Sequence, residues 1–215
     1  MRRRHLLGFT LIELLVAIAA MALLALMSWR GLEGMTRAQT VTQARGDAVL
    51  TLQTTLSQWA TDLDATIALT QLQPIDWNGS VLRITRRSGD STRPTVVVVA
   101  WALRTDAATG PQWRRWQSAG VTTRAEWQQA WDRASAWAQD GGSVAGGAEL
   151  TLMPLESWQL SYFRNGVWTA AVGAEGMANA IPDGIRLVLN LPPGTGLTGA
   201  LTRDWVRPTA VVPKT

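Results

Sequence analysis

The spacing of apolar and polar positions changes twice along the chain. Residues 9–29 form an almost unbroken apolar run, and residues 14–27 carry no polar side chain at all. As a helix, this run of about 21 residues is about 31 Å long, which matches a bilayer hydrocarbon core of about 30 Å. Three arginines precede the run and favour a cytoplasmic N-terminus. We therefore predict one transmembrane helix over residues 9–29.

The next stretch has the period of an amphipathic helix. Apolar residues recur at intervals of three or four positions, which places them on one helix face: Ala48, Leu52, Leu56, Trp59, Leu63 and Ile67. No proline interrupts residues 9–73, although Gly31, Gly34 and Gly46 weaken the middle. We predict that the helix continues over residues 30–69 and ends near Ala68. The alternative is a membrane anchor followed by a separate helix.

From residue 70 onward the pattern is that of β-strands. Strands are predicted where apolar residues alternate or where β-branched residues form a run: residues 81–86, 95–103, 149–153, 158–164, 167–171, 185–191 and 198–206. Residues 88–91 have the composition of a turn, and Asn165-Gly166 is a strong hairpin signal. The last strand, residues 198–206, is predicted at a sheet edge.

One helix interrupts these strands. Residues 123–139 have helical periodicity and begin with Thr123-Arg124-Ala125-Glu126, a candidate capping box. Trp127, Trp131 and Ala134 lie along one face of this helix, and the glycine-rich residues 141–147 are predicted to form a flexible loop. The fold class is α+β, with a long N-terminal helix packed on a globular head of antiparallel sheet, residues 70–215.

Glu13 is the one charged residue within the apolar run. A carboxylate inside a membrane helix costs roughly 2.5–3.5 kcal/mol on insertion scales, a cost that a simple anchor has no reason to carry. Glu13 is therefore interpreted as a residue that awaits a positively charged partner. The alternative, a secretory signal peptide, fits poorly because its apolar core would be longer than usual and would contain this glutamate.

The residues around Glu13, Gly8-Phe9-Thr10-Leu11-Ile12-Glu13-Leu14-Leu15-Val16-Ala17, resemble the processing and methylation motif of type IV pilins and type II secretion pseudopilins. The resemblance implies that a prepilin peptidase cuts between Gly8 and Phe9 and methylates the new amine of Phe9. Residues 1–8 then form a cleaved leader. Glu13 becomes the fifth mature residue, which in this family pairs with the terminal amine of a neighbouring subunit.

The head resembles that of the J-type minor pseudopilins of type II secretion systems, through its size, its tryptophan-containing strand and residues 182–189. This resemblance implies an inner-membrane protein of a Gram-negative bacterium, with a periplasmic head, near the tip of a pseudopilus that helps to export folded proteins. The implied partners are other minor pseudopilins, the major pseudopilin, the prepilin peptidase and the inner-membrane assembly platform. Secreted substrates are a further candidate. A minor pilin of a type IV pilus and a membrane-tethered periplasmic binding module remain as alternatives.

Composition limits the chemistry of the mature chain. The formal charge of +4 comes largely from the arginines of the leader, so the high pI does not indicate nucleic-acid binding. His5, the sole histidine, lies in the leader, and there is no cysteine. A histidine-based triad and a thiol nucleophile are thus excluded, and the sequence predicts no enzyme, no cofactor and no metal site. The alternative is a metal site formed by carboxylates that converge from distant loops. Asp62, Asp64 and Asp76 are interpreted as exposed helix and loop acids.

The chain contains 12 tryptophans. Trp29 is predicted at the membrane interface. Five others are expected in the core: Trp101, Trp127, Trp131, Trp158 and Trp168. Trp113 and Trp116 lie in a less regular stretch, where they are candidates either for an anchor that faces a partner or for a cap on the sheet.

Overall fold

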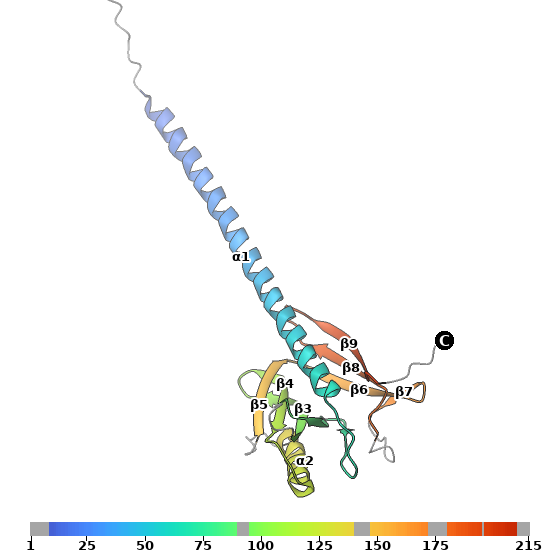
Figure 1. Cartoon of the computed structure of the whole chain (residues 1–215). Coiled ribbons are helices and arrows are strands. Elements are labelled where there is room, and N and C mark those ends of the chain that lie inside the picture. The colour runs from blue at the N-terminus through green and yellow to red at the C-terminus, as the bar shows by residue number, and fades with distance from the viewer. Residues whose placement is uncertain (1–8, 90–94, 140–146, 172–179, 195, 210–215) are drawn as a thin grey trace, which may run out of the picture. The chain divides into compact units, whose positions relative to one another are not determined.

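The computed structural model describes residues 9–89, 95–139, 147–171, 180–194 and 196–209 (Figure 1). Its elements form two units, an N-terminal segment that ends at Gly46 and a head that begins at Asp47. In the described residues, the N-terminal segment is helical and the head is an α+β domain with two antiparallel sheets. The predicted fold class, a long N-terminal helix followed by an antiparallel β-rich head, is confirmed.

The helix α1 runs over Leu11–Asp64 and contributes to both units. It ends before Ala68, the predicted end, because the chain after Asp64 pairs with a strand instead. The backbone N–H of Ile67 donates to the carbonyl of Thr85 at 3.0 Å, and that of Arg87 donates to the carbonyl of Ala65 at 3.1 Å. Within the head, the buried α1 residues include Leu52, Trp59 and Leu63, as the amphipathic pattern predicted.

The five-stranded sheet has the order β1-β2-β3-β4-β5, and all its neighbours are antiparallel. The strands are β1 (Ile75–Trp77), β2 (Val81–Arg87), β3 (Val96–Asp106), β4 (Gly110–Ser118) and β5 (Gly147–Pro154). The sequence pattern did not predict β1 or β4.

Strand β4 places Trp113 and Trp116 inside the head, where each is at most 1% exposed. The interpretation of these tryptophans as an anchor that faces a partner is therefore wrong. Trp113 belongs to the core on one side of the sheet and Trp116 to the core on the other side. Because both faces of β4 are covered, its sequence lacks the alternation that marks a half-exposed strand.

Helix α2 (Arg124–Gln139) covers one face of the five-stranded sheet, with Trp127, Trp131 and Ala134 buried as predicted. The predicted capping box is present. The Glu126 backbone N–H donates to Thr123 Oγ1 at 3.2 Å, while Glu126 Oε2 accepts from the Thr123 backbone N–H at 3.1 Å. These bonds satisfy N–H groups that the first helical turn would otherwise leave open.

The four-stranded sheet has the order β7-β6-β8-β9. Its strands are β6 (Ser157–Arg164), β7 (Val167–Ala170), β8 (Gly184–Leu191) and β9 (Gly199–Val206). Asn165 and Gly166 join β6 to β7 with φ angles of 51° and 81°, the left-handed conformation that the Asn-Gly signal predicts. Trp168 was expected in the core but is 36% exposed, because β7 is an edge strand and every residue of it is exposed.

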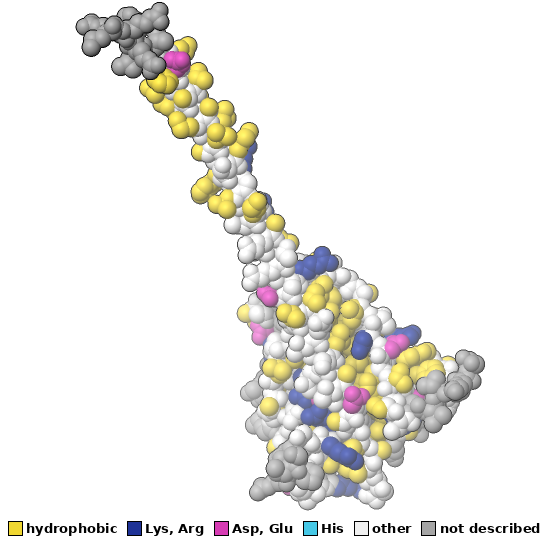
Figure 2. All heavy atoms as spheres, turned by 45° about the horizontal axis from the view of Figure 1, so that its top comes forward, with side chains coloured by type: hydrophobic (Ala, Val, Ile, Leu, Met, Phe, Trp, Pro, Cys, Tyr) yellow, Lys and Arg dark blue, Asp and Glu magenta, His cyan; other side chains and the backbone are white. Residues whose placement is uncertain are grey.

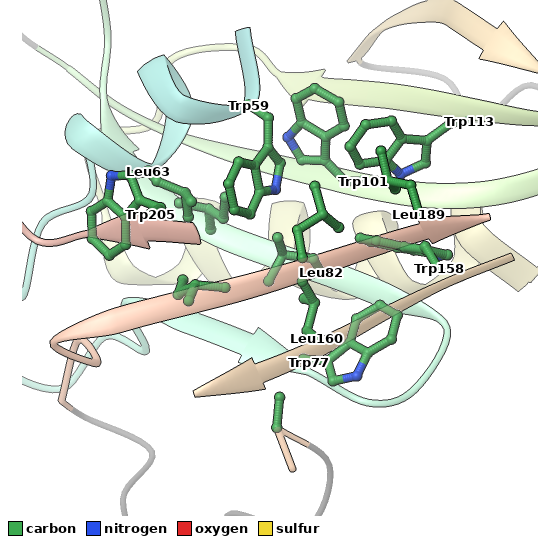
Figure 3. Close-up of a cluster of buried hydrophobic side chains, with 14 of the residues drawn as sticks. Trp59, Leu63, Trp77, Leu82, Trp101, Trp113, Trp158, Leu160, Leu189 and Trp205 are labelled. Carbon is green, nitrogen blue, oxygen red and sulfur yellow. The ribbon is translucent and has the colours of Figure 1, made fainter. Parts of the chain in front are cut away.

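A chain of tryptophan rings fills the space where the two sheets and α1 meet (Figure 3). The ring centroids lie 4.7 Å apart for Trp101 and Trp113, 5.5 Å for Trp113 and Trp158, and 4.5 Å for Trp158 and Trp77. Trp59 and Leu63 of α1 enter the same cluster. Through these contacts the last turns of α1 pack against both sheets, so this end of α1 is part of the head.

Two predicted loops fall partly outside the described residues. The turn at residues 88–91 lies there from residue 90, and the loop at residues 141–147 lies there up to residue 146. Gly147 itself begins β5, where a Cβ atom would lie 2.2 Å from Trp116 Nε1. A glycine is thus required at this position because the indole ring of Trp116 approaches the backbone too closely for any side chain.

Candidate functional site

Residues 9–29 of the N-terminal segment present a nearly continuous apolar surface. Phe9, Leu11 and Ile12 are among its most exposed side chains, and α1 contains a stretch of mean hydropathy 2.5 that is long enough to cross a membrane. Figure 2 shows hydrophobic side chains over the first turns of α1, with an acidic side chain near its start. The acidic residue of the first turn is Glu13.

Glu13 forms a second capping box, with Thr10. Its Oε2 accepts hydrogen bonds from the Thr10 backbone N–H at 3.0 Å and from Thr10 Oγ1 at 2.9 Å. The Glu13 backbone N–H lies 3.4 Å from Thr10 Oγ1. The carboxylate therefore lies at the positive end of the helix dipole, which favours an anion. Both hydrogen bonds that the carboxylate accepts end on Oε2, and no donor among the described residues bonds to Oε1.

The surroundings of Glu13 are apolar. It shares a shallow surface depression with five neighbours on its helix face: Phe9, Ile12, Val16, Ala17 and Ala20. A charge on such a surface is costly in lipid unless it is paired with an opposite charge. Phe9 and Glu13 thus lie on one face of the helix, whereas Gly8, the other predicted processing residue, lies outside the described residues.

The head contains a charged cluster that the sequence did not predict. Asp62, interpreted above as an exposed acid, is 0% exposed and lies against the five-stranded sheet. Its Oδ1 accepts from Arg86 Nη1 and Arg115 Nη2, each at 2.9 Å. Its Oδ2 accepts from Arg115 Nε at 2.7 Å and Trp101 Nε1 at 2.9 Å. One buried carboxylate therefore joins α1 to β2, β3 and β4.

The energetics of this cluster depend on complete pairing. Burial lowers the pKa of Arg86, the charge of Asp62 raises it, and the like charge of Arg115 lowers it again. Two charged guanidinium groups thus share one carboxylate in a site where water is scarce. A buried ion pair contributes little net stability compared with an apolar core of the same size. Removal of one partner, however, leaves the other charge buried and unpaired, which is destabilising. The cluster therefore fixes the position of α1 on the sheet.

The other two acids interpreted as exposed also have partners. Asp64, at the end of α1, is exposed, and its Oδ1 accepts a hydrogen bond from Trp205 Nε1 at 2.8 Å. Asp76 of β1 forms an ion pair with Arg83 of β2. Among the described residues, no group of three potential metal-ligating side chains is present. The two carboxylates thus serve the packing of the head.

A second charged cluster surrounds Glu149 on β5. Its carboxylate accepts hydrogen bonds from Arg114 Nη1 at 2.7 Å, Arg104 Nη1 at 3.2 Å and Trp137 Nε1 at 2.9 Å. Burial raises the pKa of Glu149, but the hydrogen bonds from Trp137 and Arg114 and the charges of both arginines outweigh burial, so the pKa lies below its ordinary value of 4.5.

This lowered pKa predicts how the head responds to acid. An acid whose pKa is lower in the folded state stabilises the fold above its ordinary pKa of 4.5, and this contribution is lost as the pH falls through the lowered value. We expect Glu149→Gln to be less stable than the unaltered chain at neutral pH and to lose less stability on acidification. Melting temperatures between about pH 7 and about pH 3 measure this difference.

Glu156→Gln is the matched control, since Glu156 is an exposed glutamate nearby in the sequence. Its melting temperature should follow that of the unaltered chain across the whole range. Identical acid profiles for Glu149→Gln and Glu156→Gln would contradict the assignment of this stabilisation to the Glu149 cluster.

Known proteins share features with the N-terminus and with the fold of this chain. Residues 3–29 match the prokaryotic N-terminal methylation motif. The chain carries a prepilin-type N-terminus. This motif spans Phe9 and Glu13, so the apolar run and its carboxylate lie within a recognised methylation motif. Among curated proteins, none matches the sequence.

The fold also resembles that of a solved structure. A chain in the crystal structure of the GspK-GspI-GspJ complex from the enterotoxigenic Escherichia coli type 2 secretion system is 15% identical, with a TM-score of 0.51. The similarity covers 76% of this chain and 99% of that chain. It shows the pilin-like fold of pseudopilin structures. Motif and fold agree with the resemblance to type II secretion minor pseudopilins, and the J-type assignment stays a prediction.

Proposed function

We propose that this chain is a minor pseudopilin of a type II secretion system. The single observation that carries the proposal is Glu13, a carboxylate in a helix of membrane-spanning composition, within a prepilin-type motif. The pilin-like fold supports the same reading, because it joins this helix to a folded head. The chain then acts as a building unit and carries out no chemical step itself.

Processing supplies the partner that Glu13 requires. A prepilin peptidase cuts between Gly8 and Phe9 and methylates the amine of Phe9. The amine of one subunit then pairs with Glu13 of its neighbour. In a low-dielectric surrounding this attraction is strong, but it must first offset the desolvation of both charges. Its main effect is therefore to fix the register between subunits and to recruit the next subunit.

The location and partners follow from this role. The helix holds the subunit in the inner membrane of a Gram-negative bacterium, with the head in the periplasm. Other minor pseudopilins bind the head near the tip of the pseudopilus, as a J-type subunit would, and the major pseudopilin and assembly platform bind below it. The similar protein in the GspK-GspI-GspJ complex occurs with two other chains of such a system, which supports the other minor pseudopilins as partners.

Replacement of the helix tests the proposal. We expect a chain whose residues 9–29 are exchanged for an unrelated apolar anchor without glutamate to enter the membrane but to fail in secretion. The control is an exchange that retains Phe9, Thr10 and Glu13. Secretion by a strain that depends on this subunit is the measurement. Full secretion with the unrelated anchor would contradict the proposal and favour a membrane-tethered binding module.

A further inference from the structure

The two sheets have four edge strands, and three of them carry features that discourage pairing with another chain. Strand β1 has three residues and β7 has four. Strand β5 pairs with β4, and the register of this pairing shifts between Trp113 and Arg114 of β4. Strand β5 also ends at a proline, Pro154. Strand β9 differs, because its eight residues pair with β8 without a shift, and no strand lies beyond it in the described part of the chain.

The hydrogen-bond alternation shows which backbone groups of β9 face outward. The N–H of Arg207 donates to the carbonyl of Asp183 at 2.9 Å, next to the register pair Gly184 and Val206. In an antiparallel pair, residues alternate between those bonded to the partner and those turned away from it. The residues whose N–H and C=O groups turn outward are therefore Ala200, Thr202, Asp204 and Val206.

The side chains of β9 add a charge to this edge. Six of its eight residues are exposed, and Arg203 lies between Leu201 and Trp205 on the face toward the core. Asp204 is already bound by Arg186, with distances of 2.8 and 2.7 Å. In the part of the chain that the structure describes, no carboxylate pairs with Arg203. The edge therefore presents an open row of backbone groups and one cation.

The charge of Arg203 also determines which kind of strand can pair with β9. Two copies of β9 paired antiparallel about Arg203 would bring like charges together, which is destabilising. A strand with an aspartate or glutamate opposite Arg203 would gain both the backbone hydrogen bonds and an ion pair. The occupant that complements the edge is thus an acidic strand of a different protein.

We propose that β9 is a docking edge, to which another subunit of the same assembly adds an extended strand with a carboxylate opposite Arg203. This inference rests on the proposed function and names the interface that such a subunit would use. Backbone hydrogen bonds provide the attraction, and the acidic residue provides the selection.

The test removes one outward N–H group. Thr202→Pro deletes an N–H that β8 does not use, so the ladder within the head stays intact. Thr202→Val is the matched control, since it keeps the N–H and removes only the hydroxyl. Full-length variants are co-expressed with the other minor pseudopilins, and the recovered partner is quantified. We expect roughly tenfold less partner with Thr202→Pro, and unchanged recovery with Thr202→Val.

A second variant decides the result if Thr202→Pro fails to fold. Arg203→Glu should reduce recovery by a similar factor, and Arg203→Gln by less. Recovery within about twofold of the unaltered chain for Arg203→Glu, and for Thr202→Pro if that variant folds, would overturn this inference alone. If the unaltered chain captures no subunit, the proposed function fails as well. Capture of a tagged second copy of the unaltered chain that Thr202→Pro abolishes would overturn the inference in favour of self-pairing.

Discussion

Asp62→Asn should lower the free energy of unfolding of the head by about 3–5 kcal/mol, the usual cost of removing one member of a buried ion pair. The substitution keeps the volume of the side chain but removes its charge. Arg86 and Arg115 then remain buried next to each other without a counter-charge. Denaturant unfolding of the full chain in detergent, followed by tryptophan fluorescence, measures the loss, since Trp101 donates directly to Asp62.

Asp132→Asn is the matched control for this measurement. Asp132 lies on α2, is exposed and accepts one hydrogen bond from Gln128 at 3.1 Å. Its substitution should change the free energy of unfolding by no more than about 0.5 kcal/mol. A loss for Asp62→Asn that is no larger than the loss for Asp132→Asn would show that the cluster does not hold α1 on the sheet.

Glu13→Ala should leave membrane insertion intact and abolish incorporation into a filament. Removal of the carboxylate makes the helix more apolar, so insertion becomes more favourable. The same change removes the group that pairs with the neighbouring amine. Glu13→Gln should fail as well, because it still accepts hydrogen bonds from Thr10 but carries no charge. Recovery with pseudopilus partners should fall by at least about tenfold for both variants.

Glu33→Ala provides the control for Glu13. Glu33 is also a glutamate of the N-terminal segment, but it lies beyond the apolar run and forms an exposed pair with Arg37 at 3.7 Å. Its loss should leave incorporation close to that of the unaltered chain. Equal incorporation of Glu13→Ala and Glu33→Ala would remove the basis for the assembly role of Glu13.

Local signals in the sequence predicted most of the elements. Thr123 and Glu126 give a capping box, and Asn165-Gly166 gives a hairpin, because each depends on contacts between residues close in the chain. The alternation of residues 185–191 predicted β8, since one face of that strand is buried. These signals arise from backbone conformation and from the periodic burial of one face.

The features that could not be predicted from the sequence depend on contacts between residues that are distant in the chain. Asp62 has the polarity of an exposed helix acid, and its partners Arg86 and Arg115 lie 24 and 53 positions away. Strand β4 is covered on both faces, so Trp113, Arg115 and their neighbours show no alternation. Trp168 was placed in the core because it falls on a strand pattern, yet an edge strand leaves it exposed. Only the fold brings these residues to their surroundings.

The mass of the mature N-terminus tests the central claim most directly. The protein is purified from cells with an active prepilin peptidase and from matched cells without it, and its intact mass is measured. We predict a loss of residues 1–8 and the gain of one methyl group on Phe9 in the first case only. Retention of residues 1–8 in cells with the active enzyme would contradict the account, because the amine that neutralises Glu13 would never be formed.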